Sequence, residues 1–339
     1  MSQGKTGVLI VNQGTPDSPN TPDVRKYLRE FLMDGRVIDI PYPLRWILVN
    51  GIIATFRAPK SAKEYKKLWE ERGSPLKFHL SDVNDMLQDA LGDEYIVKFG
   101  MRYQSPSLES VLDELKAANV KRIIVIPLFP QYASATTGSV NQKVGEIMSK
   151  WQIIPPVTYI NQFMDHPRFI EAFAANGKAM LDAKEYDHII FSYHGVPERH
   201  IRKGSVGDQC KLGSCCEAFH ERNRFCYRAQ CFYTTRLLAK ALDLKEDQYT
   251  TTFQSRLGKD PWVQPYTDEV LKDLPGEGKK KVLAFSPAFI ADCLETTLEV
   301  GEEFKEEFEE AGGDEWDLVP SLNTSETWVE CLKELVEEV

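Results

Sequence analysis

The stretch "HIIFSYHGVP" (188–197) decides the fold of this chain, because an apolar run ends abruptly in a histidine, a glycine and a proline. A continuous apolar run bounded by turn residues is typical of a strand that is buried on both faces of a parallel sheet. A similar stretch stands near the beginning, "GVLIVNQGTP" (7–16), and "KRIIVIPLFPQYAS" (121–134) resembles "KKVLAFSPAFIADC" (280–293) in the same way. These internal repeats favour two similar halves.

Short β-branched runs alternate with amphipathic segments along the whole chain. Strands are predicted at 6–14, 95–103, 121–130, 188–194, 249–255 and 281–287. Helices are predicted at 21–35, 107–120, 136–151, 167–184, 227–243, 267–274 and 294–311. Such alternation indicates an α/β fold in which helices cover both faces of parallel sheets.

The carboxyl ends of the predicted strands are where a ligand is expected, because loops there can carry polar groups without disrupting the core. Four strand ends carry such groups: Arg102–Tyr103, Gln131–Tyr132, His194 and 286–295. When the repeats are aligned, Gln13 corresponds to His194. Both are therefore expected to face a cleft between the two halves.

Length and charge restrict the class of protein. A chain of 339 residues is long enough for two domains. Its 51 acidic and 41 basic residues give a net charge of −10, which argues against a partner that is a nucleic acid. No secretory signal is visible, and a cytoplasmic location is expected.

The longest apolar stretch, "WILVNGIIATF" (46–56), is shorter than the about 20 residues that span a bilayer. It is interpreted as either a buried core helix or an interfacial lip.

A row of acids follows the last predicted strand. Asp292, Glu295 and Glu299 stand at i, i+3 and i+7, a spacing that puts three carboxylates on one face of an α-helix. Such a row can hold a divalent cation or relay protons, or it can simply be a helix face in solvent. Combined with the imidazole of His194, the carboxylates would suit Fe(II). The imidazole can also act as a proton acceptor.

Five of the seven cysteines lie within 22 residues, in a C-x4-CC-x9-C-x4-C pattern: Cys210, Cys215, Cys216, Cys226 and Cys231. Without a signal peptide, they are expected to be thiols or metal ligands rather than disulfides. Four thiolates can bind zinc or an iron–sulfur cluster. The x4 spacings are closer to those of plant-type ferredoxins, whereas the adjacent pair is awkward for a zinc knuckle. Free thiols are the third interpretation, and Cys215 or Cys216 is the expected spare cysteine.

The chain from about residue 6 to residue 335 resembles the ferrochelatases, which insert Fe(II) into a porphyrin. Matching stretches occur in order: "NQGTPDSP" (12–19), "GSPL" (73–76), "GMRYQSPSLES" (100–110), "IPLFPQYASATTGSV" (126–140), "SYHGVPERH" (192–200), "TFQSRLGKDPWVQPYTDE" (252–269) and "ADCLETTLE" (291–299). The resemblance implies two Rossmann-like, chelatase-type domains with parallel sheets and an active-site cleft between them.

The same resemblance implies the domain limits. The first half comprises 1–135 with a C-terminal helix at 325–339, and its segment 41–58 forms a lip at the porphyrin pocket that touches the membrane in some members. The second half, 136–324, carries His194 together with the cysteine insert, 208–232, and the acidic helix, 292–311.

The resemblance also implies roles for single residues. His194 matches the active-site histidine, Glu295 the acid opposite it, and Glu299 a second acid on a metal or proton path. Arg102 and Tyr103 match a pair in the porphyrin pocket, where Gln13 and Ser74 are also expected to bind substrate. Some bacterial members are similar in carrying a [2Fe–2S] cluster on cysteines of this segment, so a cluster is expected here.

Two departures from the family pattern limit what can be carried over. Cys293 stands where many members have histidine, and Gln13 stands where some have tyrosine.

The expected function is insertion of Fe(II) into protoporphyrin IX to give protohaem. A chelatase for coproporphyrin or for cobalt is one alternative, and an iron–sulfur electron-transfer protein is another. A cysteine-rich zinc module that binds nucleic acid is the third, and the net charge of −10 argues against it. The oligomeric state and the route of iron delivery stay open.

Overall fold

A computed structural model describes residues 4–258 and 260–339, which form two compact units. The first unit comprises Met1–Phe129, Ser134–Gln162 and Val329–Val339, and the second comprises Pro130–Ala133 and Phe163–Trp328. The division therefore lies later in the chain than the predicted one between residues 135 and 136. The reason is that residues 136–162 contain the last helix of the first unit before the division and the last strand of its sheet.

The first unit contains a four-stranded sheet in the order β2-β1-β3-β4, and all its strands are parallel. Its strands are β1 (Thr6–Gly14), β2 (Tyr95–Tyr103), β3 (Arg122–Pro127) and β4 (Val157–Tyr159). The predicted bounds of β1 and β2 are confirmed to the residue. A continuous apolar run marks β1, whereas β2 also contains Lys98 and Arg102. Leu9 and Val11 of β1 pack in one buried cluster with residues of β3 and of two helices.

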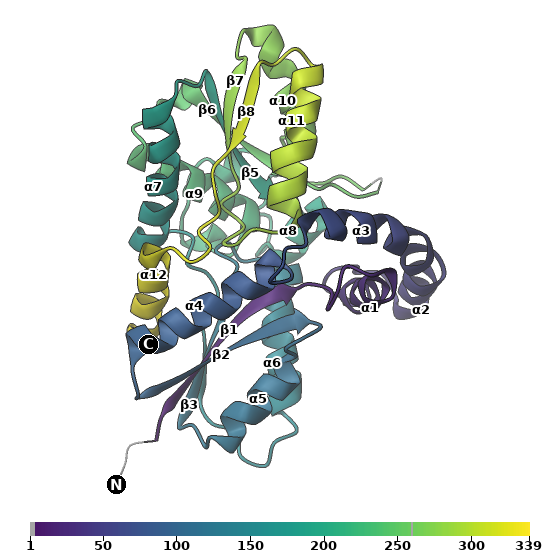
Figure 1. The fold of residues 1–339 in the computed structure, drawn as a ribbon, viewed down its shortest axis with the longest axis vertical. Coiled ribbons are helices and arrows are strands. Elements are labelled where there is room, and N and C mark those ends of the chain that lie inside the picture. Colours follow the sequence, from purple (N-terminus) through teal and green to yellow (C-terminus); the bar gives the residue numbers. More distant parts are fainter. Residues whose placement is uncertain (1–3, 259) are drawn as a thin grey trace. The chain divides into compact units, whose positions relative to one another are not determined.

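The helices of the first unit are α1 (Thr21–Leu32), α2 (Tyr42–Trp46), the π-helix η1 (Ile47–Ile53), α3 (Ala54–Leu68), α4 (Pro75–Leu91), α5 (Leu108–Ala117), the π-helix η2 (Ser134–Gly138) and α6 (Ser139–Met148). Figure 1 shows α5 and α6 on the same side of the sheet, where Val111 and Val144 join the cluster under β1 and β3. The same figure shows α1, α2 and α3 gathered beyond the carboxyl end of β1.

The segment 46–56 is not a core helix, so that interpretation is wrong. It runs through η1 into α3 and buries Val49 and Ala54, but its large side chains lie on the surface. Phe56 is 74% exposed and Ile47 is 57% exposed. An apolar surface of this kind agrees with the alternative interpretation, a lip. No helix in the described part of the chain is both long enough and apolar enough to cross a bilayer.

The second unit repeats the strand order of the first, as β6-β5-β7-β8, again with all strands parallel. Its strands are β5 (His188–His194), β6 (Tyr249–Gln254), β7 (Lys281–Phe285) and β8 (Glu315–Leu318). Strand β5 takes the place that β1 has in the first sheet, and β7 takes the place of β3. These are the two pairs of stretches that resemble each other in sequence, so the expectation of two similar α/β halves agrees with the topology.

The helices of the second unit are α7 (Pro167–Ala183), α8 (Glu198–Gly204), η3 (Ser214–Cys216), η4 (Glu221–Asn223), α9 (Tyr227–Ala241), η5 (Glu246–Gln248), α10 (Thr267–Asp273), η6 (Leu274–Glu277), the π-helix η7 (Leu294–Glu303) and α11 (Phe304–Glu310), and the division falls within α12 (Glu326–Glu337). Figure 1 shows α10 and α11 together beside β7 and β8. There Phe304, Phe308 and Trp316 pack against Ile190 and Val282 of the sheet.

Two helical glycines lead to opposite predictions. A Cβ at Gly177 in α7 would overlap the ring of Phe285, which is fully buried and stacked on Phe191. A Cβ at Gly145 in α6 would meet nothing within 4 Å. We expect Gly177→Ala to lower the free energy of unfolding by about 1–3 kcal/mol through overpacking. Gly145→Ala should raise it by up to about 1 kcal/mol, because alanine favours the helix.

Differential scanning calorimetry of both variants beside the wild type measures these changes. An unchanged or raised transition temperature in Gly177→Ala would show that α7 does not pack against β7 as described.

Candidate active site at the strand ends

His194 is the last residue of β5 and is partly buried. Its Nδ1 lies 2.7 Å from the carbonyl oxygen of Gly195. Because a carbonyl oxygen can only accept a hydrogen bond, Nδ1 carries the proton of the neutral ring and Nε2 keeps a lone pair. The rings of Trp262 and Phe289 lie 6.4 Å from the imidazole, centroid to centroid. The strand end therefore presents a nitrogen that can accept a proton or bind a metal, with aromatic neighbours.

The prediction that three carboxylates share one face of a helix is wrong for Asp292. Asp292 lies before the helix, which begins at Leu294, and its Oδ2 accepts a hydrogen bond from Asn323 at 2.9 Å. Glu295 and Glu299 do lie together on η7. This helix is a π-helix, a rare form that is often found at functional sites.

Glu299 is held by two uncharged donors from the end of β6. The hydroxyl of Ser255 lies 2.5 Å from its Oε2, and the amide of Gln254 lies 3.1 Å from the same oxygen. Burial raises the pKa of Glu299 above its ordinary value, and the negative charge of Glu295 acts in the same direction. The hydrogen bond from Ser255 and the charge of His194 oppose that rise in pKa. The charges of His194 and Glu295 thus both act on the carboxyl group of Glu299.

Sequence reasoning assigned no role to Gln254 or Ser255. The carboxamide of Gln254 accepts a hydrogen bond from Ser192 at 2.8 Å and donates to the carbonyl oxygen of Glu295 at 3.1 Å, besides its bond to Glu299. Ser255 has a φ of 64°, an uncommon conformation for a residue other than glycine. Their position at the end of a predicted strand, inside the matching stretch "TFQSRLG", was the signal that could have found them.

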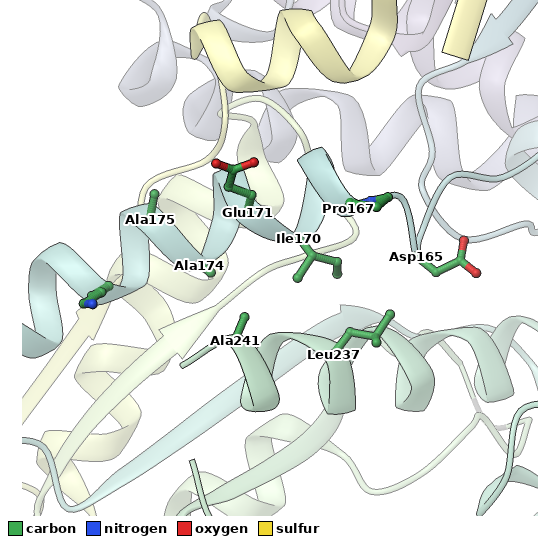
Figure 2. Close-up of a pocket in the computed structure, with 9 residues that line it drawn as sticks. Asp165, Pro167, Ile170, Glu171, Ala174, Ala175, Leu237 and Ala241 are labelled. Atoms are coloured by element: carbon green, nitrogen blue, oxygen red, sulfur yellow. The ribbon is translucent and has the colours of Figure 1, made fainter. Parts of the chain in front are cut away.

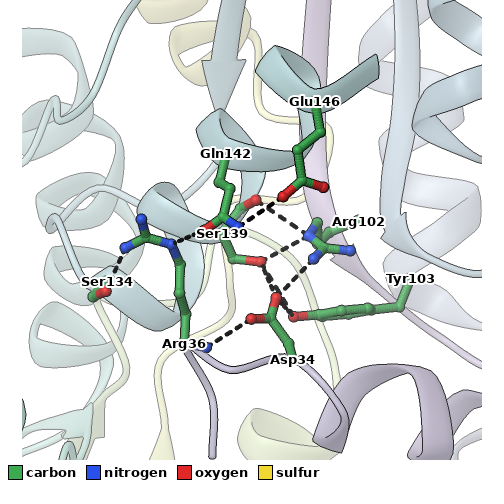
Figure 3. A network of polar contacts seen from close by, with 8 residues as sticks. All are labelled: Asp34, Arg36, Arg102, Tyr103, Ser134, Ser139, Gln142 and Glu146. Carbon is green, nitrogen blue, oxygen red and sulfur yellow. Dashed lines mark hydrogen bonds and ion pairs between the residues drawn. The ribbon is translucent and has the colours of Figure 1, made fainter. Parts of the chain in front are cut away.

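In the first unit, Arg102 and Tyr103 converge on a carboxylate that sequence reasoning missed (Figure 3). The guanidinium of Arg102 donates to Asp34 and to the hydroxyl of Ser139, each at 2.7 Å, and the hydroxyl of Tyr103 donates to Asp34 at 2.9 Å. The side chains of Arg102 and Asp34 are only 15% and 9% exposed. The charge of Arg102 is therefore already paired within the protein.

Two effects compete at Asp34. Burial alone would raise the pKa of its carboxyl group, but the hydrogen bonds from Ser139 and from the backbone of Arg36, with the charge of Arg102, hold that pKa below its ordinary value. The folded pKa is thus lower than the unfolded one. The carboxylate contributes stability above the unfolded pKa, and this contribution is lost as the pH falls through the folded pKa.

The other two predicted substrate-binding residues also lie in the first unit. Gln13 is the penultimate residue of β1, partly buried, and its backbone N–H donates to the side chain of Asn12 at 2.7 Å. Ser74 is buried directly before α4, and its hydroxyl accepts a hydrogen bond from Thr15 at 2.9 Å. Ser74 thus presents little surface to a ligand in this conformation.

Four of the five clustered cysteines form a chain of contacts. Cys210 and Cys215 share a thiol hydrogen bond, the sulfurs of Cys215 and Cys216 lie 3.9 Å apart, and the thiol of Cys216 hydrogen-bonds with Cys226. That last bond lowers the pKa of the Cys226 thiol. Cys231 differs, because it is fully buried in α9 and burial raises the pKa of its thiol.

As the side chains lie, no three His, Cys, Asp or Glu residues in the described ranges converge to enclose a metal ion.

A groove of about 540 Å³ lies elsewhere in the second unit, between α7 and α9. Figure 2 shows Ile170 and Ala174 of α7 and Leu237 and Ala241 of α9 pointing into it. None of the predicted site residues lines this groove.

The ferrochelatase family model matches residues 5–339. The chain belongs to the ferrochelatase family. It is 45% identical over 334 residues to the ferrochelatase of Legionella pneumophila strain Lens, which covers 98% of this chain and 99% of the relative. It is 41% identical over 342 residues to the ferrochelatase of Coxiella burnetii strain Dugway 5J108-111, which covers 99% and 94%. As a ferrochelatase it is an enzyme, a lyase of haem biosynthesis.

Solved structures agree with this family at the level of the fold. SirB from Bacillus subtilis with Fe3+ aligns with a TM-score of 0.57 at 10% identity, over 98% of this chain and 95% of SirB. The two parallel sheets of this ferrochelatase are thus of the chelatase type.

The pair formed by Arg102 and Asp34 leads to a prediction. Asp34→Asn leaves a largely buried guanidinium without its counter-charge, so we expect the free energy of unfolding to fall by about 3–5 kcal/mol. Asp82→Asn is the matched control, because Asp82 is also paired with an arginine, Arg72, here through two hydrogen bonds on the surface. That loss should stay within about 1 kcal/mol.

Urea denaturation followed by tryptophan fluorescence compares the two variants. Equal losses would mean that the pair in the first unit is no better shielded from solvent than the surface pair.

Proposed function

We propose that this ferrochelatase inserts ferrous iron into protoporphyrin IX to form protohaem, with His194 as the proton acceptor. The observation that carries the proposal is the hydrogen bond from Nδ1 of His194 to the carbonyl oxygen of Gly195. It leaves Nε2 unprotonated in the neutral ring. Insertion of a metal requires the removal of two pyrrole N–H protons, and an imidazole is the side chain best suited to accept them near neutral pH.

Glu295 and Glu299 are proposed to guide the cation and to carry protons away. Imidazole and carboxylate together suit Fe(II) and leave positions open for exchange. The raised pKa of Glu299 supports a proton-carrying role, because its carboxyl group holds a proton up to a higher pH than an exposed carboxyl group does. His194 can serve as a transient iron ligand through the same nitrogen.

The first unit is proposed to contribute the porphyrin pocket through Gln13, Ser74, Arg102 and Tyr103. Since Arg102 is paired with Asp34, this part of the pocket would present a rigid hydrogen-bonding wall rather than an unpaired positive charge. The apolar surface of 41–58 supports its role as a lip beside the macrocycle and as a peripheral contact with a membrane from the cytoplasmic side.

The cysteine insert is proposed to hold a [2Fe–2S] cluster. The donor set fits, because a cluster of this type is held by four thiolates, and Cys210, Cys215, Cys216 and Cys226 are joined by contacts in that order. The guanidinium of Arg228 hydrogen-bonds with Cys216 and would offset thiolate charge. This set leaves out Cys231, whereas the sequence expectation left out Cys215 or Cys216. Metal insertion is not a redox reaction, so the proposed role of the cluster is structural.

The central prediction concerns His194→Ala. We expect the rate of haem formation from Fe(II) and protoporphyrin to fall by about 10²–10⁴-fold, the usual contribution of a general base. Porphyrin binding, measured by fluorescence titration, should persist. The absorbance of haem after quenching measures the rate, and His220→Ala is the matched control because that histidine lies exposed in the cysteine insert.

Two further results would change the proposal. Faster turnover of coproporphyrin or of cobalt than of protoporphyrin and iron would reassign the substrate. A His194→Ala variant as active as the His220→Ala control would remove His194 from the chemistry.

The proposed cluster predicts colour. Protein purified without oxygen should absorb above 400 nm and contain two iron atoms and two acid-labile sulfides per chain. Cys226→Ser should abolish the absorption, whereas Cys231→Ser and Cys331→Ser should retain it. Zinc in place of iron, or loss of the absorption in Cys231→Ser with a normal circular dichroism spectrum, would contradict this ligand set.

A further inference from the structure

We propose that Tyr227 is a positioning residue for His194 and that it ties the catalytic strand end to the cysteine insert. The hydroxyl of Tyr227 donates a hydrogen bond to the backbone carbonyl oxygen of His194 at 2.7 Å. Tyr227 is the first residue of α9 and follows Cys226 of the insert directly. This inference rests on the proposed role of His194.

The peptide group between His194 and Gly195 is held at both ends. Its N–H donates to the carbonyl oxygen of Gln254 at 2.8 Å, in continuation of the pairing between β5 and β6. Its C=O receives the hydroxyl of Tyr227. The orientation of this peptide group places Gly195, whose own carbonyl oxygen accepts the proton of His194 Nδ1. Tyr227 therefore stabilises the tautomer in which Nε2 is the proton acceptor.

Tyr227 is well suited to a fixed position. Its side chain is only 7% exposed, and its hydroxyl also hydrogen-bonds with the thiol of Cys231 one turn further along α9. A buried donor with a fixed acceptor keeps its geometry better than one in exchange with water.

The first turn of α9 connects the insert with two loops at the strand ends. The thiol of Cys226 contacts Cys216 within the insert, while Tyr227 holds the carbonyl of His194. Arg228 donates to the carbonyl oxygen of Gln264 at 3.1 Å, in the loop that follows Trp262, and hydrogen-bonds with Cys216. Three consecutive residues thus join the cysteines to both segments that surround the imidazole. A change at the insert thiols, by metal loading or by oxidation, would move the same helix turn that positions His194.

The test reads the tautomer of His194 directly, by NMR of protein labelled with ¹⁵N in its six histidines. The signals of His194 are assigned from their loss in His194→Ala. We expect the wild type to show the Nδ1–H tautomer and Tyr227→Phe to show a mixture of both tautomers. Tyr193→Phe is the matched control: Tyr193 is also buried and directly precedes His194, but its hydroxyl hydrogen-bonds with Thr235. That variant should keep the tautomer of the wild type.

Activity provides a second readout. Loss of one neutral hydrogen bond should lower kcat of Tyr227→Phe by about threefold to tenfold, without a change in KM for the porphyrin. Tyr193→Phe should keep the kcat of the wild type. A single Nδ1–H tautomer in Tyr227→Phe would overturn the positioning role, whatever the activity. Conversely, an inactive wild type with the expected tautomers would contradict the proposed function alone.

A double-mutant cycle tests the link to the insert. Cys226→Ser should shift the ¹⁵N signals of His194 in the wild-type background, and should shift them much less in the Tyr227→Phe background, where the connection is already broken. If Cys226→Ser leaves the His194 signals unchanged, the insert is not coupled to the strand end. Equal shifts in both backgrounds would show that the coupling does not pass through Tyr227.

Discussion

The candidate site depends on one side chain amide, that of Gln254, which joins three elements of the second unit. Its oxygen accepts from Ser192 in β5, and its nitrogen donates to the carboxylate of Glu299 and to the backbone of Glu295 in the π-helix. Because one group makes all three contacts, the orientation of the carboxamide is determined, and with it the distance between the strand ends and the acids. Replacing it by an apolar group would leave several buried polar groups unpaired, which is more costly than the loss of any single bond.

The repeated topology separates two kinds of chemistry. Strands β1 and β5 occupy the same place in sheets of the same order, so Gln13 and His194 stand at equivalent ends. In the first unit the charged groups near the strand ends neutralise each other, as Arg102 and Asp34 do. In the second unit an imidazole and two carboxylates interact without an arginine among the donors to Glu299. At these strand ends, the first unit thus presents a paired arginine and carboxylate, and the second unit presents titratable groups.

The sequence predicted features that depend on neighbouring residues better than features that depend on contacts between distant residues. The bounds of β1, β2 and β5 were predicted to the residue. In β1 and β5, burial on both faces imposes a continuous apolar run. The partner of Arg102 was not predicted, since Asp34 lies 68 residues away and only the folded chain brings them together. The prediction of a helical row of acids failed at Asp292 for a local reason: Cys293 has an extended backbone, so the helix begins only at Leu294, two residues after Asp292. Exposure of the apolar segment 46–56 could not be read from its composition.

Two carboxyl groups in this chain show why the acids on the π-helix are better explained by function than by stability. Asp34 and Glu299 are both largely withdrawn from solvent, and burial by itself acts to raise the pKa of each carboxyl group. At Asp34 the hydrogen bonds from Ser139 and from the backbone of Arg36, together with the charge of Arg102, outweigh burial, and the pKa falls. At Glu299 the donors are a hydroxyl and an amide, burial prevails, and the pKa rises despite the neighbouring His194. A sequence selected for stability alone would pair or replace such an acid. Its position within reach of the charge of His194 agrees with the proposed site that accepts and releases protons.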